Sequence, residues 1–151
     1  MALGKSGYMK QIVIYLSQND FQKAYELSRE YTTNFEKEMI SHFLFAKASF
    51  ALEKYQEAAL SARTAFNLSA NEDDMLTCAV LASTAYFKLK DYQGGLELLR
   101  QMEKIKVSEE LEELLFVFSL AMKEESEAVK HLDTLYGLNR KTAENLLIRF
   151  L

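Results

Sequence analysis

Few side chains in this sequence could perform catalysis or hold a metal ion. The chain contains two histidines, His42 and His131, and a single cysteine, Cys78. The histidines are far apart in the sequence and each falls in a helical pattern, so we interpret them as surface or half-buried residues. Cys78 stands among apolar residues, which predicts a small buried side chain and not a nucleophile. We therefore expect no catalytic residue and no soft-metal site.

Two other sets of residues are similar to known binding motifs, one for phosphate and one for a cation, but each lacks part of what such a site needs. Gly4-Lys5-Ser6 is like the end of a phosphate-binding loop, but that motif needs a strand and a glycine five residues earlier, ahead of the first residue. The carboxylates Glu109, Glu110, Glu112 and Glu113 could bind a cation. They surround the start of a predicted helix, so we interpret them as a solvated face that complements the helix dipole. The sequence thus predicts no cofactor and no metal.

The composition favours long helices. The 151 residues are 49% apolar and 26% charged, which is typical of a globular protein, and this length predicts one domain spanning 1–151. Proline and tryptophan are absent and only five glycines occur. Because sheets and their turns depend on glycine and proline, this usage favours helices joined by short polar corners.

The net charge and the hydropathy of the sequence limit the kinds of partner and the cellular location that we expect. The net charge of −4 argues against nucleic acid, since phosphate binding needs a cationic surface. The longest apolar run, around 114–118, is far shorter than the roughly 20 residues that cross a bilayer, so we expect no membrane insertion. The first residues lack the apolar core of a signal peptide, and one cysteine cannot form an internal disulfide. We expect a cytoplasmic protein.

A polar corner preceding an aromatic residue recurs along the chain. The aligned positions Phe21, Tyr55, Tyr92 and Glu125 are 34, 37 and 33 residues apart. Apolar residues on both sides of each corner follow the i, i+3, i+4, i+7 helical spacing. Two amphipathic helices joined by a short corner fold back as an antiparallel hairpin. The recurrence therefore predicts consecutive helical hairpins.

A small residue follows each of these positions by three residues, which predicts close packing of the two backbones within a hairpin. These small residues are Ala24, Ala58, Gly95 and Ala128. The helices that the pattern predicts are 5–17, 20–32, 35–52, 55–68, 72–89, 92–106, 109–123, 126–136 and 140–150.

Capping signals set the expected helix ends. Thr33 and Glu36 fit a capping box that opens a helix near residue 34. Asn71 and Ser108 each precede acidic residues, as N-caps do. Gly137 is expected to end the penultimate helix, and Asn139 is expected to start the last one.

With these features the sequence resembles the tetratricopeptide repeat family. Four units, 5–38, 39–75, 76–108 and 109–139, carry residues at the family's characteristic small and aromatic positions, and a terminal helix, 140–150, follows. The matching residues are Tyr15, Phe21 and Ala24 in the first unit, Ala46, Tyr55, Ala58 and Ala65 in the second, Ser83, Tyr86, Tyr92 and Gly95 in the third, and Ala128 in the fourth. The family's tryptophan and proline are missing. The resemblance implies an all-α, right-handed superhelix of antiparallel hairpins with a C-terminal capping helix.

The resemblance also implies a concave groove lined by the first helix of each hairpin. The candidate groove residues are Met9, Val13, Ile40, Phe43, Lys47, Phe50, Val80, Thr84, Phe87 and Lys88. An apolar groove of this kind suits an amphipathic helix or an apolar peptide. The alternative is that a short array coils tightly and buries part of this face in its own core. Family members that grip acidic C-termini use basic and amide side chains where this chain has Met9, Val13, Thr77 and Leu81, so that binding mode is not expected.

Two functions follow from this interpretation. The first is a non-enzymatic protein-interaction module, an adaptor, scaffold or chaperone that holds a helical or extended segment of a protein or peptide partner. The alternative is an architectural subunit that self-associates, for example as a homodimer, or sits inside a larger assembly. The resemblance implies no cofactor for either.

Overall fold

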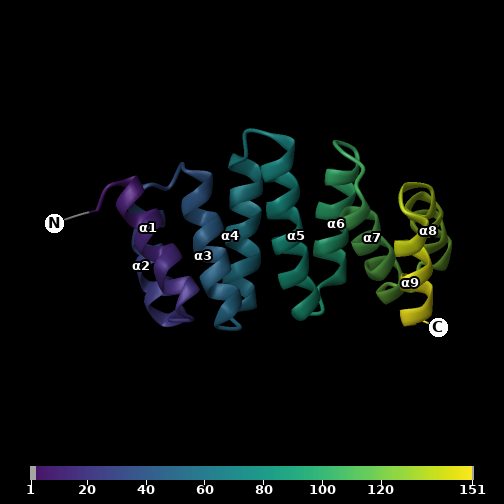
Figure 1. The fold of residues 1–151 in the computed structure, drawn as a ribbon, viewed down its shortest axis with the longest axis horizontal. Coiled ribbons are helices and arrows are strands. Elements are labelled where there is room, and N and C mark those ends of the chain that lie inside the picture. The colour runs from purple at the N-terminus through teal and green to yellow at the C-terminus, as the bar shows by residue number, and fades with distance from the viewer. Residues whose placement is uncertain (1–2, 151) are drawn as a thin grey trace. The chain divides into compact units, whose positions relative to one another are not determined.

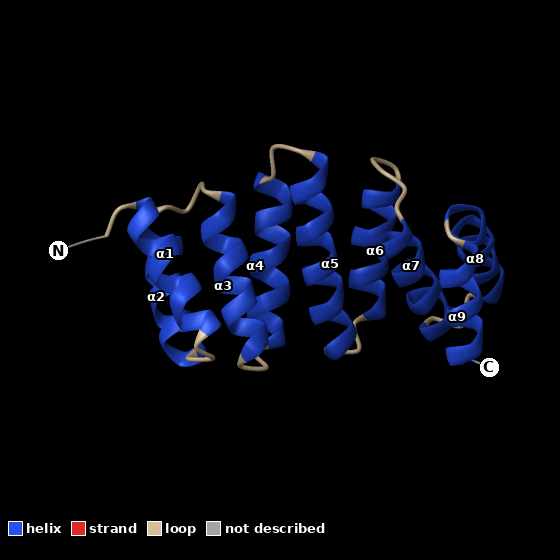
Figure 2. Cartoon of the chain, viewed as in Figure 1, coloured by secondary structure: helices blue, strands red, loops and turns tan. Residues whose placement is uncertain are grey.

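The structure is a computed structural model that describes residues 3–150. These residues form nine α-helices and no strand, as the composition and the repeat predicted (Figure 1, Figure 2). The helices are α1 (Lys5–Ser17), α2 (Phe21–Asn34), α3 (Met39–Ala51), α4 (Tyr55–Leu68), α5 (Glu72–Lys88), α6 (Tyr92–Glu103), α7 (Glu109–Ala121), α8 (Glu125–Leu138) and α9 (Arg140–Phe150).

The helices form two compact groups. The N-terminal group extends to Leu89 and holds α1 to α5, and the C-terminal group begins at Lys90 and holds α6 to α9. Within each group consecutive helices pack against one another and run in opposite directions (Figure 1). This arrangement confirms the predicted hairpins that lie within one group, namely α1–α2, α3–α4 and α7–α8. In the N-terminal group α3 also contacts α1 and α5, so these three helices are neighbours.

The corners of the repeat share one backbone conformation. Each has a residue with a left-handed φ of 59° or 60°, although none of these residues is glycine. In the first corner the N–H of Asp20 donates to the carbonyl of Tyr15 at 2.9 Å, a bond that closes the end of α1 in a Schellman motif. The left-handed residues are Asn19, Glu53, Lys90 and Lys123.

Asn71 and Ser108 are confirmed as the N-caps of α5 and α7. Asn71 Oδ1 accepts the N–H of Asp74 at 2.9 Å, and Ser108 Oγ accepts the N–H of Leu111 at 3.2 Å. Three acidic residues follow each cap in the first turn of α5 and of α7, where the helix dipole favours negative charge.

The helix ends predicted from Thr33 and Gly137 were wrong. Thr33 lies inside α2, where its hydroxyl donates to the carbonyl of Arg29 at 3.1 Å, and α3 begins only at Met39. Gly137 lies inside α8, which ends at Leu138. The expected start of α9 at Asn139 is confirmed, because Asn139 Oδ1 accepts the N–H of Thr142 at 3.2 Å.

Each group has its own core. In the N-terminal group Tyr8 of α1 stacks on Tyr31 of α2 with ring centroids 5.0 Å apart, and Phe35 meets both rings edge-on. In the C-terminal group α9 buries Ala143 and Leu146 completely. These two side chains pack in one cluster with residues of α7 and α8, so α9 covers the end of the C-terminal group as the predicted cap.

The small residues after the corners are buried, but the reason at Gly95 differs from the predicted one. The exposed fraction is at most 1% at Ala24, Ala58 and Ala128, and Gly95 is also buried. A Cβ atom at Gly95 would lie 2.8 Å from Cζ of Phe118 on α7. The close contact is therefore between successive hairpins rather than between the two helices of one hairpin.

Candidate protein-binding surface

The candidate groove residues all lie in the N-terminal group, on its three neighbouring helices α1, α3 and α5. We call these ten residues the α1–α3–α5 face. They are Met9 and Val13 on α1, Ile40, Phe43, Lys47 and Phe50 on α3, and Val80, Thr84, Phe87 and Lys88 on α5.

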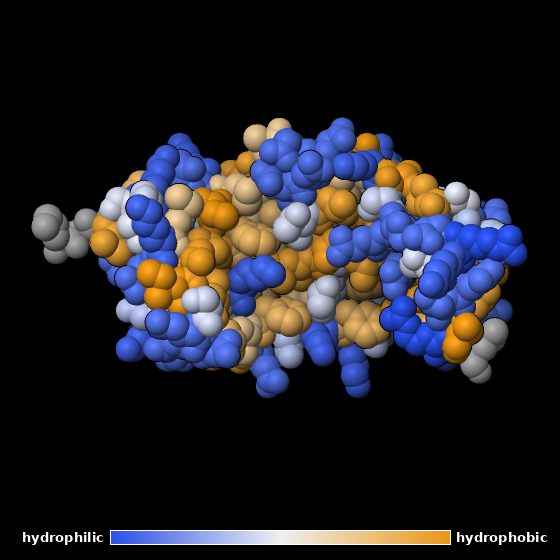
Figure 3. Space-filling model, in the orientation of Figure 1, coloured by the Kyte–Doolittle hydropathy of each residue, from blue (hydrophilic) through white to orange (hydrophobic). Residues whose placement is uncertain are grey.

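None of the ten residues is fully buried. Val13 is 53% exposed and Phe87 is 36% exposed, and the two lysines are also exposed. The other six are half-buried. Ile40 and Phe43 pack with one side against the buried cluster around Tyr8, so these positions contribute to the core and to the surface together. Figure 3 shows apolar atoms gathered over the region of α3, α4 and α5.

A small pocket opens between α3 and α5. Its volume of about 90 Å³ is well below the roughly 300–1,000 Å³ of small-molecule sites, but it can admit an apolar side chain. The residues that line it are Met39, Ile40, Phe43, Asp74, Thr77 and Cys78.

Two lysines add positive charge to this apolar face. The Lys47 ammonium lies 5.6 Å from the ring centroid of Phe43, within cation–π range. Lys88 is exposed in the last turn of α5. The face therefore combines aromatic contact area with cations at its edge.

The remaining candidates from the sequence do not form a catalytic arrangement in the described part of the chain. Lys5 begins α1 and pairs with Glu38 at 2.5 Å. His42 is half-buried, with Nε2 2.6 Å from the carbonyl oxygen of Glu36. Cys78 is 1% exposed, and this burial raises the pKa of its thiol, which keeps it protonated and unreactive.

The structure brings together His131 and Glu112, which the sequence analysis treated separately, with Glu103, which it did not single out. His131 Nδ1 lies 3.3 Å from Glu103 Oε2 and 3.4 Å from Glu112 Oε1. The residues come from α8, α6 and α7, so all three belong to the C-terminal group. We call them the Glu–Glu–His cluster.

The burial of this cluster corrects two predictions. Glu112, expected on a solvated face, is 1% exposed, and His131, expected at or near the surface, is 6% exposed. Glu112 shares the buried stripe of α7 with residues three, four and seven positions later, and this periodic signal was available in the sequence. The other members of the stripe are Leu115, Phe116 and Ser119.

Burial also changes the protonation of the cluster. Burial, and after it the hydrogen bond and negative charge of the neighbouring Glu103 carboxyl, together raise the pKa of Glu112 to about 8. Burial lowers the pKa of His131, against the opposing effect of the Glu103 and Glu127 carboxylates. Both side chains therefore favour their neutral forms near neutral pH.

Two comparisons address the fold. Residues 7–65 match the family of "Anaphase-promoting complex, cyclosome, subunit 3". A solved structure described as "MamA RS-1 ArsTM double mutant", a protein with tetratricopeptide repeats, superposes with a TM-score of 0.79 over 98% of this chain and 86% of that chain. The fold is that of a tetratricopeptide-repeat protein.

The superposition shows a common fold despite a low sequence identity. The superposed structure is only 14% identical in sequence to this chain. No curated protein sequence matches this chain. Within residues 3–150 of this chain, no helix is long and apolar enough to cross a membrane.

Proposed function

We propose that this tetratricopeptide-repeat protein is a non-enzymatic interaction module, an adaptor, scaffold or chaperone that acts in the cytoplasm. Its α1–α3–α5 face binds an apolar helical or extended segment of a protein partner. The observation that carries this proposal is the incomplete burial of all ten residues of the face across three neighbouring helices. Stacked helical hairpins present extended surfaces of this kind to their partners.

The shape of the face favours a peptide segment over a small molecule. The pocket between α3 and α5 offers about 90 Å³, which suits one apolar side chain. An amphipathic segment can place one anchor there and further anchors against the exposed parts of Val13 and Phe87. Lys47 and Lys88 at the edge favour a segment that is acidic or that ends in a carboxylate.

Selection from a displayed peptide library tests this proposal. The wild-type protein is the bait, and the Phe50→Ser/Phe87→Ser variant serves for counter-selection. We expect enriched peptides with apolar residues at helical or alternating spacing that bind the wild type and not the variant. Peptides that bind both proteins equally, or no enrichment, would contradict the proposal.

A second function, an architectural subunit that self-associates or joins a larger assembly, is supported by two observations. Residues 7–65 match a family named for a subunit of a multi-subunit complex. In addition, α9 exposes Ile148 by 76% and Phe150 by 46%, which leaves apolar area at the end of the C-terminal group. Light scattering after size-exclusion chromatography separates the two functions, since a concentration-independent dimer favours the architectural one and a monomer favours the binding module.

A further inference from the structure

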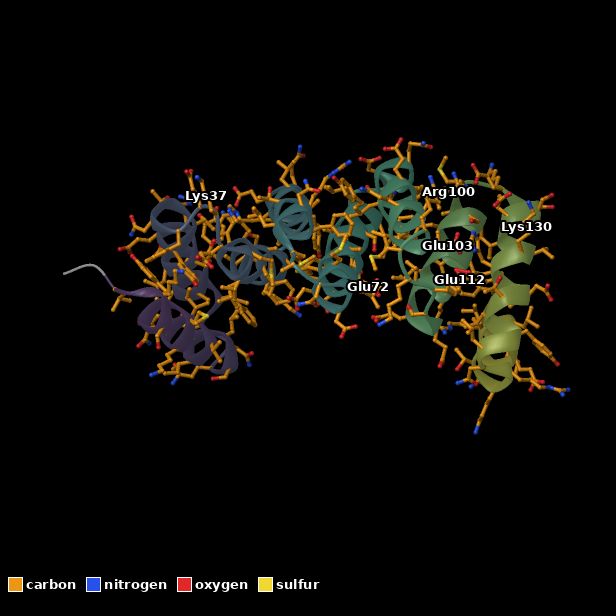
Figure 4. The ribbon with its side chains drawn as sticks, turned by 90° about the horizontal axis from the view of Figure 1, so that it is seen from above. Lys37, Glu72, Arg100, Glu103, Glu112 and Lys130 are labelled. Atoms are coloured by element: carbon orange, nitrogen blue, oxygen red, sulfur yellow. The ribbon has the colours of Figure 1, made fainter. Side chains whose placement is uncertain are left out.

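We propose that the Glu–Glu–His cluster binds one divalent transition-metal ion, Zn²⁺ by preference. Its members, Glu103, Glu112 and His131, come from three consecutive helices, α6, α7 and α8. Figure 4 labels Glu103 and Glu112, whose side chains lie close together where α6 and α7 pack. This site is separate from the α1–α3–α5 face and does not depend on the proposed function.

The spacing of the three side chains fits a common metal ion. One ligand atom from each residue can be chosen so that all three lie within 4.8 Å of one another. His131 Nδ1 is 3.3 Å from Glu103 Oε2 and 3.4 Å from Glu112 Oε1. Two atoms bound to one zinc ion at about 2.0–2.2 Å in a tetrahedral arrangement lie about 3.4 Å apart. Both carboxyl groups thus lie at ligand spacing from the imidazole nitrogen.

The buried carboxylate of Glu112 provides independent support. This residue is 1% exposed, and its Oε2 atom has no hydrogen-bond partner although it lies 3.4 Å from His131 Nδ1. A buried carboxyl oxygen without a partner is costly, and a cation that displaces the proton of Glu112 on binding removes that cost.

Two cationic side chains near the cluster are engaged by carboxylates outside it. Arg100 forms an ion pair with Glu124 at 2.7 Å, and Lys130 forms one with Glu127 at 3.1 Å. A divalent ion would supply positive charge at the point where the two carboxylates and the imidazole meet.

The ligand types select the class of metal ion. Imidazole suits Zn²⁺ and its neighbours in the transition series, whereas Mg²⁺ and Ca²⁺ prefer oxygen ligands and more of them. Three protein ligands leave one tetrahedral position free for water. The Glu103 side chain is 29% exposed, so this position can be reached from solvent. A bound ion would tie α6, α7 and α8 together.

Metal titration of the full chain tests the site. After treatment with a chelator, ZnCl₂ is added and followed by calorimetry and thermal unfolding. We expect one ion per chain, and a rise in Tm of about 5 °C or more at a hundredfold excess over Kd. MgCl₂ and CaCl₂ at the same concentration should leave Tm unchanged.

Two variants and two matched controls locate the bound ion. Glu112→Gln and His131→Asn should lose the stoichiometric binding and the rise in Tm. Glu110→Gln on the exposed side of α7 and His42→Asn in the N-terminal group should retain both. Equal Zn²⁺ responses in all four variants would show that the ion binds elsewhere and would overturn the proposal.

A spectroscopic measurement covers the case in which a variant fails to fold. CoCl₂ bound to the wild-type chain at this site should give the intense visible absorption of four-coordinate Co²⁺, and one equivalent of ZnCl₂ should remove it. A wild-type chain that gives only the weak spectrum of hydrated Co²⁺ and no calorimetric Zn²⁺ binding has no such site.

Discussion

Phe118 of α7 fills the space that a side chain at Gly95 of α6 would need. A Cβ atom at Gly95 would lie 2.8 Å from Cζ of that ring, and Phe118 itself is 1% exposed. Tyr92, one turn before Gly95, meets the same ring edge-on at 6.4 Å between centroids. Helices α6 and α7 are therefore joined by a contact that accepts no larger residue at Gly95.

Replacing Gly95 by leucine should destabilise the protein. The new side chain has to displace the Phe118 ring within a packed core, and overpacking of this kind costs about 1–3 kcal/mol or more. Urea unfolding followed by circular dichroism measures the loss. Gly137→Ala is the control, because a Cβ atom there meets nothing within 4 Å inside α8, and it should stabilise by about 0.5–1 kcal/mol. An unchanged stability of Gly95→Leu would contradict the observed packing.

Replacing Glu53 by glycine should stabilise the second corner. Glu53 has a left-handed φ of 60° and an exposed side chain, so glycine removes backbone strain without loss of contacts. We expect a gain of about 0.5–1 kcal/mol, after the greater freedom of glycine in the unfolded chain is subtracted. Glu53→Val should lower the stability, because a β-branched residue tolerates this backbone conformation poorly. Thermal unfolding measures the change in stability of both variants. A change in the same direction for both would contradict this prediction.

The double substitution Phe50→Ser/Phe87→Ser should abolish partner binding while the helical circular dichroism signal persists. Aromatic anchors in a binding site contribute about 2 kcal/mol or more each. Leu60→Ser is the control, since Leu60 is 59% exposed on α4, outside the α1–α3–α5 face. If the double variant unfolds well below the wild-type Tm, these side chains belong to the core and the groove interpretation is withdrawn.

Removal of the positive charge on the same face should weaken binding mildly. Lys47→Ala/Lys88→Ala is expected to lower the affinity for an acidic or C-terminal segment, and the difference from wild type should shrink as salt is added. Binding isotherms at low and high ionic strength measure the effect. A loss that is independent of salt would assign the lysines a packing role instead of an electrostatic one.

Truncation after Leu138 should destabilise the C-terminal group. It removes α9, whose Ala143 and Leu146 are completely buried, and it breaks the ion pair between Arg149 and Glu113 at 3.0 Å. The burial of Leu146 alone contributes about 2 kcal/mol. Ile148→Ser is the control, because Ile148 is 76% exposed on the same helix and its loss should leave Tm unchanged. A truncated chain as stable as the full one would refute the capping role.

The helical hairpins could be predicted from the sequence because their signals are local. Apolar periodicity and the polar corners place the helices to within a few residues, and Asn71 and Ser108 act as the caps that their neighbours suggested. The capping box at Thr33 failed because Tyr31 stacks on Tyr8 and α2 continues past it to Asn34. A tertiary contact there outweighs a local capping signal.

The Glu–Glu–His cluster illustrates what the sequence could not supply. The burial of Glu112 and His131 was readable from apolar residues at helical spacing on α7 and α8. Their approach to Glu103 was not, because it depends on how α6 packs against the following hairpin. The ten groove candidates came from a family pattern, and their role in binding stays a prediction.

The packing of consecutive helices has a kinetic consequence. Within each compact group, the main helix contacts in the described chain join elements that are adjacent or next but one in the sequence. Such a topology has a low contact order, because little loop entropy is lost before a hairpin gains its contacts. Hairpins can therefore nucleate independently and fold within milliseconds or faster, so a nascent chain would bury its apolar faces as each hairpin is completed.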